Sequence, residues 1–331
     1  MQGVKIYSEK HLSRYLSLRK GETKLGEKVT FLGTSEELSE KPAQFVIFGI
    51  PEDIGVRANH GKPGTSTAWE AFLGAFLNVQ DNRFFDGGKI LLLGEIDTSE
   101  EMQKAGNIDV SDPNYHQKLG DLTEIVDKKV SAVVKRIISA GKIPVIIGGG
   151  HNNAYGNLKG ASEAFDNPVN ALNIDAHTDL RTTDYRHSGN GFSYALKNGF
   201  LSRYSVFGLH QNYTPEYIFK EMHDSEAIHY NLFENLQRDD FEFHFQKNLE
   251  FVKGEKFGFE IDCDAIAGFP SSAISPTGFT LNEVRNFVRQ TAHEKNCCYL
   301  HVCEAIAKSD LPTGKAISFL VTDFLKNNTH E

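Results

Sequence analysis

The segment NIDAHTDLR, residues 173–181, places ionisable side chains at alternate positions. Asp175, His177 and Asp179 share one parity of this segment. Alternate side chains of an extended chain point to the same side, so two carboxylates and one imidazole can converge on one point. Such groups are costly to bury without a partner, and a cation is a partner that satisfies all three. The segment therefore predicts a metal site.

Two further clusters have the same character. His151 follows the apolar stretch IPVII and three glycines, and Asp262 and Asp264 stand in EIDCD at the end of another apolar stretch. In this second stretch the acidic and apolar residues have opposite parity. One face can therefore pack into the core while Asp262 and Asp264 lie together on the other face. Nucleotide binding is the weaker alternative, because GGGH lacks a following GK[ST] and the chain has no GxGxxG.

Each cluster has an ordinary explanation when it is taken alone. A histidine after a glycine turn can be a cap or a hydrogen-bonded polar residue, and a DxD at a strand end can cap a helix or hold magnesium. The three clusters together favour a metal centre. Two imidazoles and four carboxylates suit Mn²⁺ better than the thiolate ligands of a structural zinc site would. Four carboxylates exceed what one dication needs, so we predict two ions that share carboxylates and activate a water for hydrolysis.

Apolar stretches that predict strands alternate along the chain with helical patterns. The predicted strands are 44–50, 89–96, 143–147, 169–175, 203–210, 256–264 and 297–304. Helices are predicted over 67–77, 118–140 and 314–328, with a loop over 51–67. This alternation is typical of a mostly parallel sheet covered on both faces. The three polar clusters follow strands, at the edge where open α/β sheets bind ligands.

We expect residues 41–331 to form a single α/β domain, preceded by a segment, 1–40, without a clear pattern. The net charge of −9 argues against nucleic acid or an anionic membrane as partner. No apolar run approaches the roughly 18 residues of a membrane span. The N-terminus lacks the pattern of a secretory signal, and the four cysteines lack CxxC spacing. Reduced thiols and a cytoplasmic location are therefore expected.

From about Phe45 to Phe324, the order and separation of GGGH, DAHTD and IDCD resemble those of the ureohydrolases, the family of arginases, agmatinases and formimidoylglutamases. The resemblance implies a three-layer α/β/α fold with a mostly parallel sheet, a homo-oligomer, and hydrolysis of a guanidino or amidino C–N bond. It also implies two Mn²⁺ per subunit. Their implied ligands are His151, Asp175, Asp179 and Asp262 for one ion, and His177, Asp175, Asp262 and Asp264 for the other. Asp175 and Asp262 would bridge the two ions.

Departures from the arginase pattern favour the formimidoylglutamase branch. Arginases carry a proton-transferring histidine after their SGN segment, where this chain has Gly191 and Phe192. Gly150 stands where arginases have an aspartate before the first ligand, and DAHTDLR carries Arg181. GVRANHGKPG resembles the formimidoylglutamase loop GVxxNxGRxG, with Lys62 in place of arginine, and GFPSSAISPTGFT imperfectly resembles their P-x-x-x-x-P-G form.

N-formimidoyl-L-glutamate carries two carboxylates and one amidinium, so its pocket needs cations and one acid. Arg181 is the expected carboxylate-binding residue, because its guanidinium can donate two parallel hydrogen bonds. By analogy with the SGN segment of the family, Ser188 and Asn190 are expected to bind a substrate carboxylate. Glu304 matches the late glutamate that pairs with the cationic group, and Asp179 is expected to pass a proton to the leaving amine. Weaker candidates are Arg57, Lys62 and Arg186 for the carboxylates, and His187 for the proton.

The predicted function is hydrolysis of N-formimidoyl-L-glutamate, a small molecule, to L-glutamate and formamide in histidine degradation. One alternative is an arginase or another guanidino-acid hydrolase, which would release urea. A second is a non-catalytic metal-binding scaffold, which would be expected to have lost a ligand, whereas all six are present.

Overall fold

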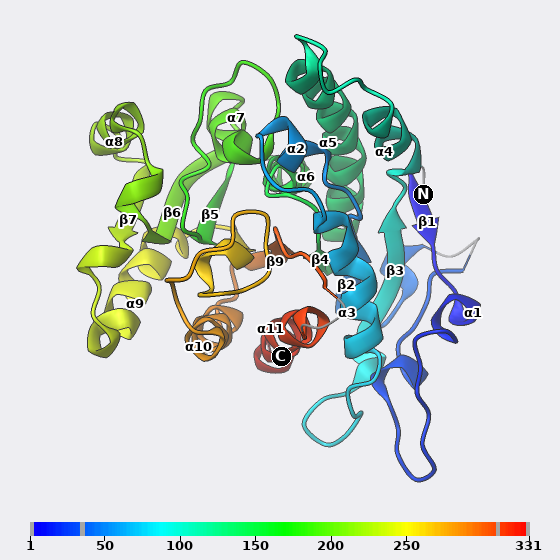
Figure 1. The fold of residues 1–331 in the computed structure, drawn as a ribbon. Coiled ribbons are helices and arrows are strands. Elements are labelled where there is room, and N and C mark those ends of the chain that lie inside the picture. The colour runs from blue at the N-terminus through cyan, green and yellow to red at the C-terminus, as the bar shows by residue number, and fades with distance from the viewer. Residues whose placement is uncertain (1–2, 34–36, 309–311, 329–331) are drawn as a thin grey trace.

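A computed structural model describes residues 3–33, 37–308 and 312–328. Within these ranges nine strands form one sheet in the order β1-β3-β2-β4-β9-β8-β5-β6-β7. The strands are β1 (Val4–Ile6), β2 (Phe45–Gly49), β3 (Ile90–Ile96), β4 (Ile143–Ile147), β5 (Val169–Ile174), β6 (Leu201–Leu209), β7 (Ile228–Leu232), β8 (Phe257–Asp262) and β9 (Cys297–Cys303). β1 is antiparallel to β3 at one edge, and the other neighbouring pairs are parallel (Figure 1). The predicted mostly parallel sheet is confirmed.

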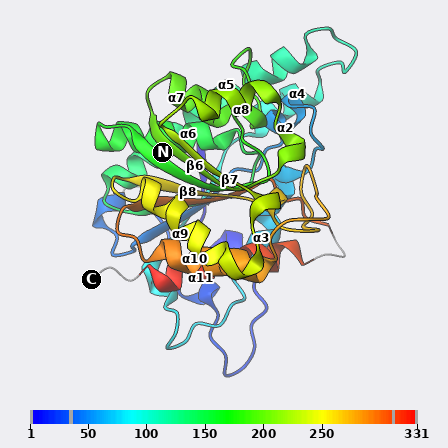
Figure 2. The same cartoon turned by 90° about the vertical axis from the view of Figure 1, so that its left-hand side faces the viewer.

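Helices cover both faces of the sheet, as the three-layer fold requires. Figure 2 shows α5 to α8 on one side of the strands, and α3 with α9 to α11 on the other. The helices are α1 (Glu9–Leu12), α2 (Ile54–Ala58), α3 (Ala68–Phe76), α4 (Ser99–Gly106), α5 (Tyr115–Ser139), α6 (Asn153–Phe165), α7 (Gly191–Lys197), α8 (Glu216–His223), α9 (Phe241–Val252), α10 (Leu281–Ala292) and α11 (Thr313–Asn327). Across the described ranges, no helix is both long and apolar enough to cross a membrane.

The core is divided by the sheet into two apolar clusters. In β2, Phe45 and Ile47 belong to the cluster under α3 and α11, whereas Val46 and Phe48 belong to the cluster under α5 and α6. Successive strand side chains point to opposite faces, so a strand buried on both faces must be apolar at every position. This explains why the central strands are continuous apolar runs in the sequence.

Several segments differ from the sequence-based expectations, which included no strand at β7. Residues 51–67, predicted as a loop, contain the short helix α2. The N-terminal segment contributes β1, in which Val4 is paired with Ile96 and Ile6 with Gly94. The division of the chain at residue 40 remains a prediction.

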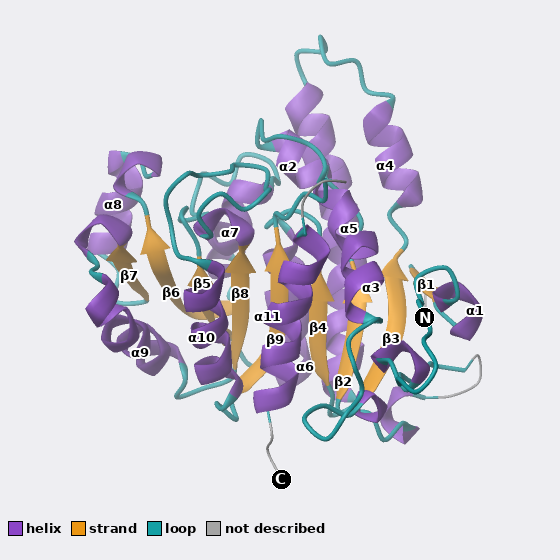
Figure 3. Cartoon of the chain, turned by 60° about the horizontal axis from the view of Figure 1, so that its bottom comes forward, coloured by secondary structure: helices purple, strands orange, loops and turns teal. Residues whose placement is uncertain are grey.

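The central strands β4, β9, β8 and β5 are consecutive neighbours in the sheet. In Figure 3 the arrowheads of the large strands point toward the same end of the molecule, where the long loops gather. The predicted polar clusters follow β4, β5 and β8, so the sheet brings them to one edge although they are far apart in sequence.

Candidate active site

Each predicted ligand lies at the carboxyl end of a central strand or in the loop after it. Asp175 directly follows β5, and Asp262 is the last residue of β8. His151 is reached through a turn at Gly148 and Gly149, whose φ angles of 90° and 72° favour glycine. A Cβ atom at Gly149 would lie 2.3 Å from the Asn153 side chain, so the turn also needs glycine for space.

His151 stands among three aspartates. Its Nδ1 atom lies 3.1 Å from Asp175 Oδ2, 2.9 Å from Asp179 Oδ2 and 3.1 Å from Asp262 Oδ2. One ligand atom from each of the four residues lies within 4.8 Å of all the others. An imidazole nitrogen and three buried carboxylate oxygens converging on one point fit a divalent ion such as Mn²⁺.

His177 and Asp264 lie on the other side of the same aspartates. His177 Nδ1 is 3.5 Å from Asp175 Oδ1 and 3.7 Å from Asp264 Oδ2. Asp175 therefore presents one oxygen toward His151 and the other toward His177. Asp262 is arranged similarly, because its Oδ2 approaches His151 while its Oδ1 accepts the backbone N–H of Asp264 at 2.7 Å.

Burial raises the pKa of three of the four aspartates, whereas contacts with His151 and His177 lower the pKa of Asp175. Burial and the neighbouring charges of Asp264 and Asp175 raise the pKa of Asp262 well above its usual value. Burial also raises the pKa of Asp179 and of Asp264. It opposes protonation of His177, yet the contact with Asp175 outweighs it and raises the pKa of His177 to about 10. A bound dication would displace these protons.

Glu304, directly after β9, lies beside the aspartates. Its Oε1 accepts the backbone N–H of His151 at 2.6 Å, and its Oε2 accepts the Ser272 hydroxyl. Burial, together with the charge of Asp264, raises the pKa of Glu304 to about 8. The φ angles of Glu304 and Asp179 are 61° and 50°. Left-handed backbone at a residue other than glycine costs on the order of 1–3 kcal/mol and is concentrated at functional sites.

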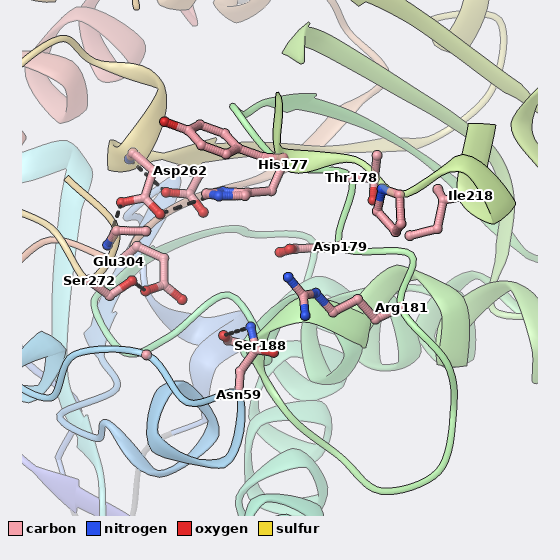
Figure 4. Close-up of a pocket in the computed structure, with 15 residues that line it drawn as sticks. Asn59, His177, Thr178, Asp179, Arg181, Ser188, Ile218, Asp262, Ser272 and Glu304 are labelled. Atoms are coloured by element: carbon pink, nitrogen blue, oxygen red, sulfur yellow. Dashed lines mark hydrogen bonds and ion pairs between the residues drawn. The ribbon is translucent and has the colours of Figure 1, made fainter. Parts of the chain in front are cut away.

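A cavity of about 170 Å³ opens over the aspartates. Figure 4 shows it with Glu304 and His177 on one side, and with Arg181 facing Ser188 and Asn59 across it. The Arg181 guanidinium makes no hydrogen bond or ion pair with any residue that the structure describes. Asn59 donates a hydrogen bond to Ser188 Oγ at 3.1 Å. The cavity thus joins an acidic floor, which could hold a metal ion, to a wall with an unpaired cation.

Asn190 differs from the expectation that it binds substrate. It is fully buried, and its Nδ2 donates to the backbone carbonyls of Thr182 and Tyr185 at 2.9 and 2.8 Å. Its Oδ1 accepts from Arg186 and from the His187 backbone. The amide is fully used inside the protein, so we assign it to the support of the loop.

Three weaker candidates, Arg57, Lys62 and His187, are also unsuited to the roles suggested for them. Arg57 donates to the Ala105 carbonyl at 2.8 Å and to Tyr115 at 3.0 Å, and Lys62 is exposed outside the lining. Burial, together with the charges of Arg186 and Arg181, lowers the pKa of His187 to about 3, so its ring is neutral and is not an imidazolium acid.

Phe192 belongs to the Gly191–Phe192 segment that, by the resemblance, replaces the proton-transferring histidine of arginases. Its ring is buried and packs edge-on against His151 with 5.2 Å between centroids, and it stacks on Tyr204. This position therefore orients His151 by packing and contributes no titratable group.

Sequence reasoning missed Glu52 as part of the site. This buried carboxylate accepts hydrogen bonds from the backbone N–H of Ile54 and Gly150 at 2.7 and 3.0 Å, and from Asn153 Nδ2 at 2.7 Å. It fixes the turn that delivers His151. The available signal was an acid two residues after the apolar run FVIFGI, at the same strand edge as the other clusters. Tyr213, whose ring stacks on His177 at 5.1 Å, gave no comparable signal.

The fold and the site together describe an α/β/α protein with a carboxylate-rich cluster at its sheet edge that could hold a metal ion. The sequence matches the Arginase family over residues 43–325, and the chain belongs to this family.

Relatives and solved structures agree with that assignment. A formimidoylglutamase of Rhodococcus jostii is 28% identical over 182 residues, 52% of this chain and 49% of that protein. The chain thus spans about half the length of this relative. One from Geobacillus thermodenitrificans is 25% identical over 288 residues, 85% of this chain and 83% of that protein.

Two solved structures share the fold. The formimidoylglutamase from Bacillus subtilis superposes with a TM-score of 0.76 at 16% identity, covering 95% of each chain. Trypanosoma cruzi formiminoglutamase with Mn²⁺ gives 0.74 at 18% identity, covering 92% of this chain and 98% of that one. Identities this low establish likeness of fold.

Proposed function

We propose that the protein is a binuclear manganese hydrolase that cleaves N-formimidoyl-L-glutamate to L-glutamate and formamide. The observation that carries this proposal is the pairing, in one cavity, of the acidic cluster around His151 with the unpaired Arg181 guanidinium. A substrate that is cationic at its reacting end and anionic at its other end matches this division of charge. The relatives named formimidoylglutamase, and the Mn²⁺ bound by the Trypanosoma cruzi protein, support it.

Two sets of residues are proposed to hold the ions. The first is His151, Asp175, Asp179 and Asp262, and the second is His177, Asp175, Asp262 and Asp264. Bound there, the ions would supply Lewis acidity and lower the pKa of a water so that it attacks the formimidoyl carbon.

The chain's own residues would orient and protonate the substrate. Glu304 is proposed to pair with the amidinium, and Arg181 with a glutamate carboxylate that Ser188 would also contact. Addition of water to the formimidoyl carbon is followed by cleavage of its bond to the glutamate nitrogen. Asp179 is proposed to relay a proton from the attacking water to that nitrogen, because its carboxylate lines the cavity beside the reacting carbon. Formamide leaves with the terminal nitrogen.

The proposal also covers the metabolic pathway, the location and the oligomeric state. A formimidoylglutamate hydrolase would act on a small molecule in histidine degradation, and we propose a cytoplasmic location and a homo-oligomer in keeping with the family resemblance.

A substrate panel tests the proposal. Protein loaded with Mn²⁺ would be assayed against N-formimidoyl-L-glutamate, arginine, agmatine and guanidino acids, with formamide, glutamate and urea measured separately. We expect formamide and glutamate in equal amounts from the first compound. Urea from a guanidino compound, with no formamide, would overturn the proposal in favour of another arginase-family activity. Absence of turnover on every compound would favour a non-catalytic scaffold.

A further inference from the structure

Arg186 is a buried cation whose every N–H has an acceptor. The side chain is 1% exposed and pairs with Asp127 of α5, with Nε 2.8 Å from Oδ2 and Nη2 3.3 Å from Oδ1. Nη2 also donates to the Asn152 carbonyl at 2.8 Å, and Nη1 donates to Asn190 Oδ1 at 2.5 Å and to the His187 carbonyl at 3.3 Å. Five donors with five acceptors leave the guanidinium one orientation.

These acceptors belong to three separate parts of the chain. Asp127 lies in the middle of α5, and Asn152 directly follows the proposed ligand His151. Asn190 closes the loop 181–190 by donating to the Thr182 and Tyr185 carbonyls. That loop carries Arg181 and Ser188, and Arg181 N donates to the Gly189 carbonyl at 3.0 Å. Arg186 therefore connects the loop that lines the substrate cavity to the segment that carries the metal ligand.

The surrounding aromatic rings hold the same orientation. The Arg186 guanidinium carbon lies 4.9 Å from the ring centroids of both Tyr155 in α6 and Tyr194 in α7. Replacing a buried ion pair by apolar groups of similar size is often neutral or stabilising. An apolar side chain could therefore stabilise the fold here as well as a buried arginine does, so stability alone does not explain Arg186.

We propose that Arg186 is a positioning residue that sets the loop 181–190, and with it Arg181 and Ser188, relative to the metal centre. This inference rests on the proposed function for its kinetic consequence, but its structural consequence can be measured independently. Loss of Arg186 should release the loop and weaken substrate binding, while the aspartates that hold the ions keep their places.

The decisive variant removes both charges, because Arg186→Met alone would leave the buried carboxylate of Asp127 without a partner. In Arg186→Met/Asp127→Asn the core stays neutral, whereas the contacts to Asn152 and Asn190 are lost. The matched control is Arg285→Met/Asp323→Asn. That pair, between α10 and α11, has the same two-bond geometry at 2.6 and 3.3 Å and lies outside the cavity lining. Arg186→Lys, which keeps the charge but loses the planar fork, serves as a milder second variant.

Three measurements would be made on each Mn²⁺-loaded protein: kinetics with N-formimidoyl-L-glutamate, metal content, and amide hydrogen exchange of peptides spanning 181–190. In the Arg186 double variant we expect kcat/KM to fall by about tenfold to a hundredfold, mainly through KM, as for a small displacement of a binding group. Exchange in 181–190 should become faster, and metal content should equal that of the wild type. Arg186→Lys should show the same changes to a smaller extent, and the control should show none.

Wild-type KM and wild-type exchange in both Arg186 variants would overturn the inference. Metal loss in proportion to activity would also overturn it, because Arg186 would then act through His151. If the wild-type enzyme fails to hydrolyse N-formimidoyl-L-glutamate, the proposed function falls. The exchange measurement still decides the role of Arg186 in that case.

Discussion

At the scale of single residues, the unpaired guanidinium of Arg181 is the feature that would most clearly distinguish a substrate with a carboxylate from one without. Its guanidinium reaches the cavity without a partner among the described residues, whereas the neighbouring Arg186 has all its donors satisfied internally. An unpaired guanidinium can make two parallel hydrogen bonds to a substrate carboxylate, which an ammonium group cannot reproduce.

We expect Arg181→Lys to raise KM for N-formimidoyl-L-glutamate several-fold. For Arg181→Ala we expect the fall in kcat/KM to correspond to a loss of about 1.5–3 kcal/mol in transition-state stabilisation, the value of a hydrogen bond to a charged group. Both variants should retain the metal content of the wild type, because Arg181 lies outside the proposed ligand set. Steady-state kinetics with metal analysis make the comparison. Equal kinetics in the three proteins would remove Arg181 from the substrate site.

Glu304 is predicted to act on the transition state. If it pairs with the amidinium, Glu304→Gln should lower kcat/KM by roughly 10²–10³, as expected for loss of a buried charge-assisted contact. The amide still accepts the His151 N–H, so metal content should barely change. Near-normal activity would contradict this prediction and would indicate that Glu304 has a structural role at the end of β9.

The ligand set illustrates what residue spacing can and cannot predict. Alternation along DAHTD indicated that Asp175, His177 and Asp179 would converge, and all three lie at the cluster. However, β5 ends at Ile174 and Asp179 has a left-handed φ of 50°, so the segment is not an extended strand. Asp179 turns toward His151 while His177 approaches Asp264. The role of Asn190 could not be predicted, because its partners come from the fold of its own loop and from Arg186.

At the scale of elements, the buried central strands were predictable, whereas several helices, the central α6 among them, were not. Buried parallel strands are continuous apolar runs, which the sequence displays directly. By contrast, α6 contains Gly156 and Gly160, which disfavour a helix on propensity alone. The structure explains them, because a Cβ atom at Gly160 would lie 2.5 Å from the Ser131 carbonyl oxygen of α5. Close packing of α5 against α6 therefore outweighs propensity, and this is a tertiary effect. The short helix α2 and the half-buried strand β7 gave similarly weak local signals.

A pair of glycine substitutions tests this explanation. Gly160→Ala should destabilise the protein by about 1–3 kcal/mol, since the added methyl group meets backbone that cannot move independently. Gly74→Ala in α3, where an added Cβ meets nothing within 4 Å, should stabilise it by about 0.4–1 kcal/mol. Chemical denaturation monitored by circular dichroism gives both values. Destabilisation of equal size at both sites would contradict the packing explanation.

At the scale of the whole molecule, the proposed metal centre would connect strands that the chain order separates. A metal that binds the folded protein and not the unfolded chain stabilises it by about 4 kcal/mol at a thousandfold excess over the dissociation constant. We therefore expect saturating Mn²⁺ to raise Tm, and the shift to be abolished in Asp175→Ala and Asp262→Ala, the proposed bridging residues. Differential scanning calorimetry with metal analysis provides the test, and two ions retained in either variant would contradict the assignment.

Metal binding should also release protons. The raised pKa values of Asp262, Asp179, Asp264 and His177 mean that these groups hold protons more tightly than usual without a cation, and they must lose these protons to bind one. Because the pKa of His177 is about 10, Mn²⁺ affinity should increase as pH rises toward that value. Isothermal titration calorimetry in buffers of different ionisation enthalpy counts the released protons. A binding enthalpy independent of the buffer would show that no protons are displaced.

The position of β9 has a consequence for the synthesis of the protein. Until β8 and β9 have been made, β1-β3-β2-β4 and β5-β6-β7 are two half-sheets with no strand between them. The open edges of β4 and β5 are apolar strands, and exposed edges of this kind invite association between nascent chains. β9, the strand between β4 and β8, leaves the ribosome more than 120 residues after Asp175. We therefore expect His151 and Asp262 to come together, and the proposed ions to bind, only after β9 has been made. Chains stalled before residue 297 should thus bind chaperones instead of Mn²⁺.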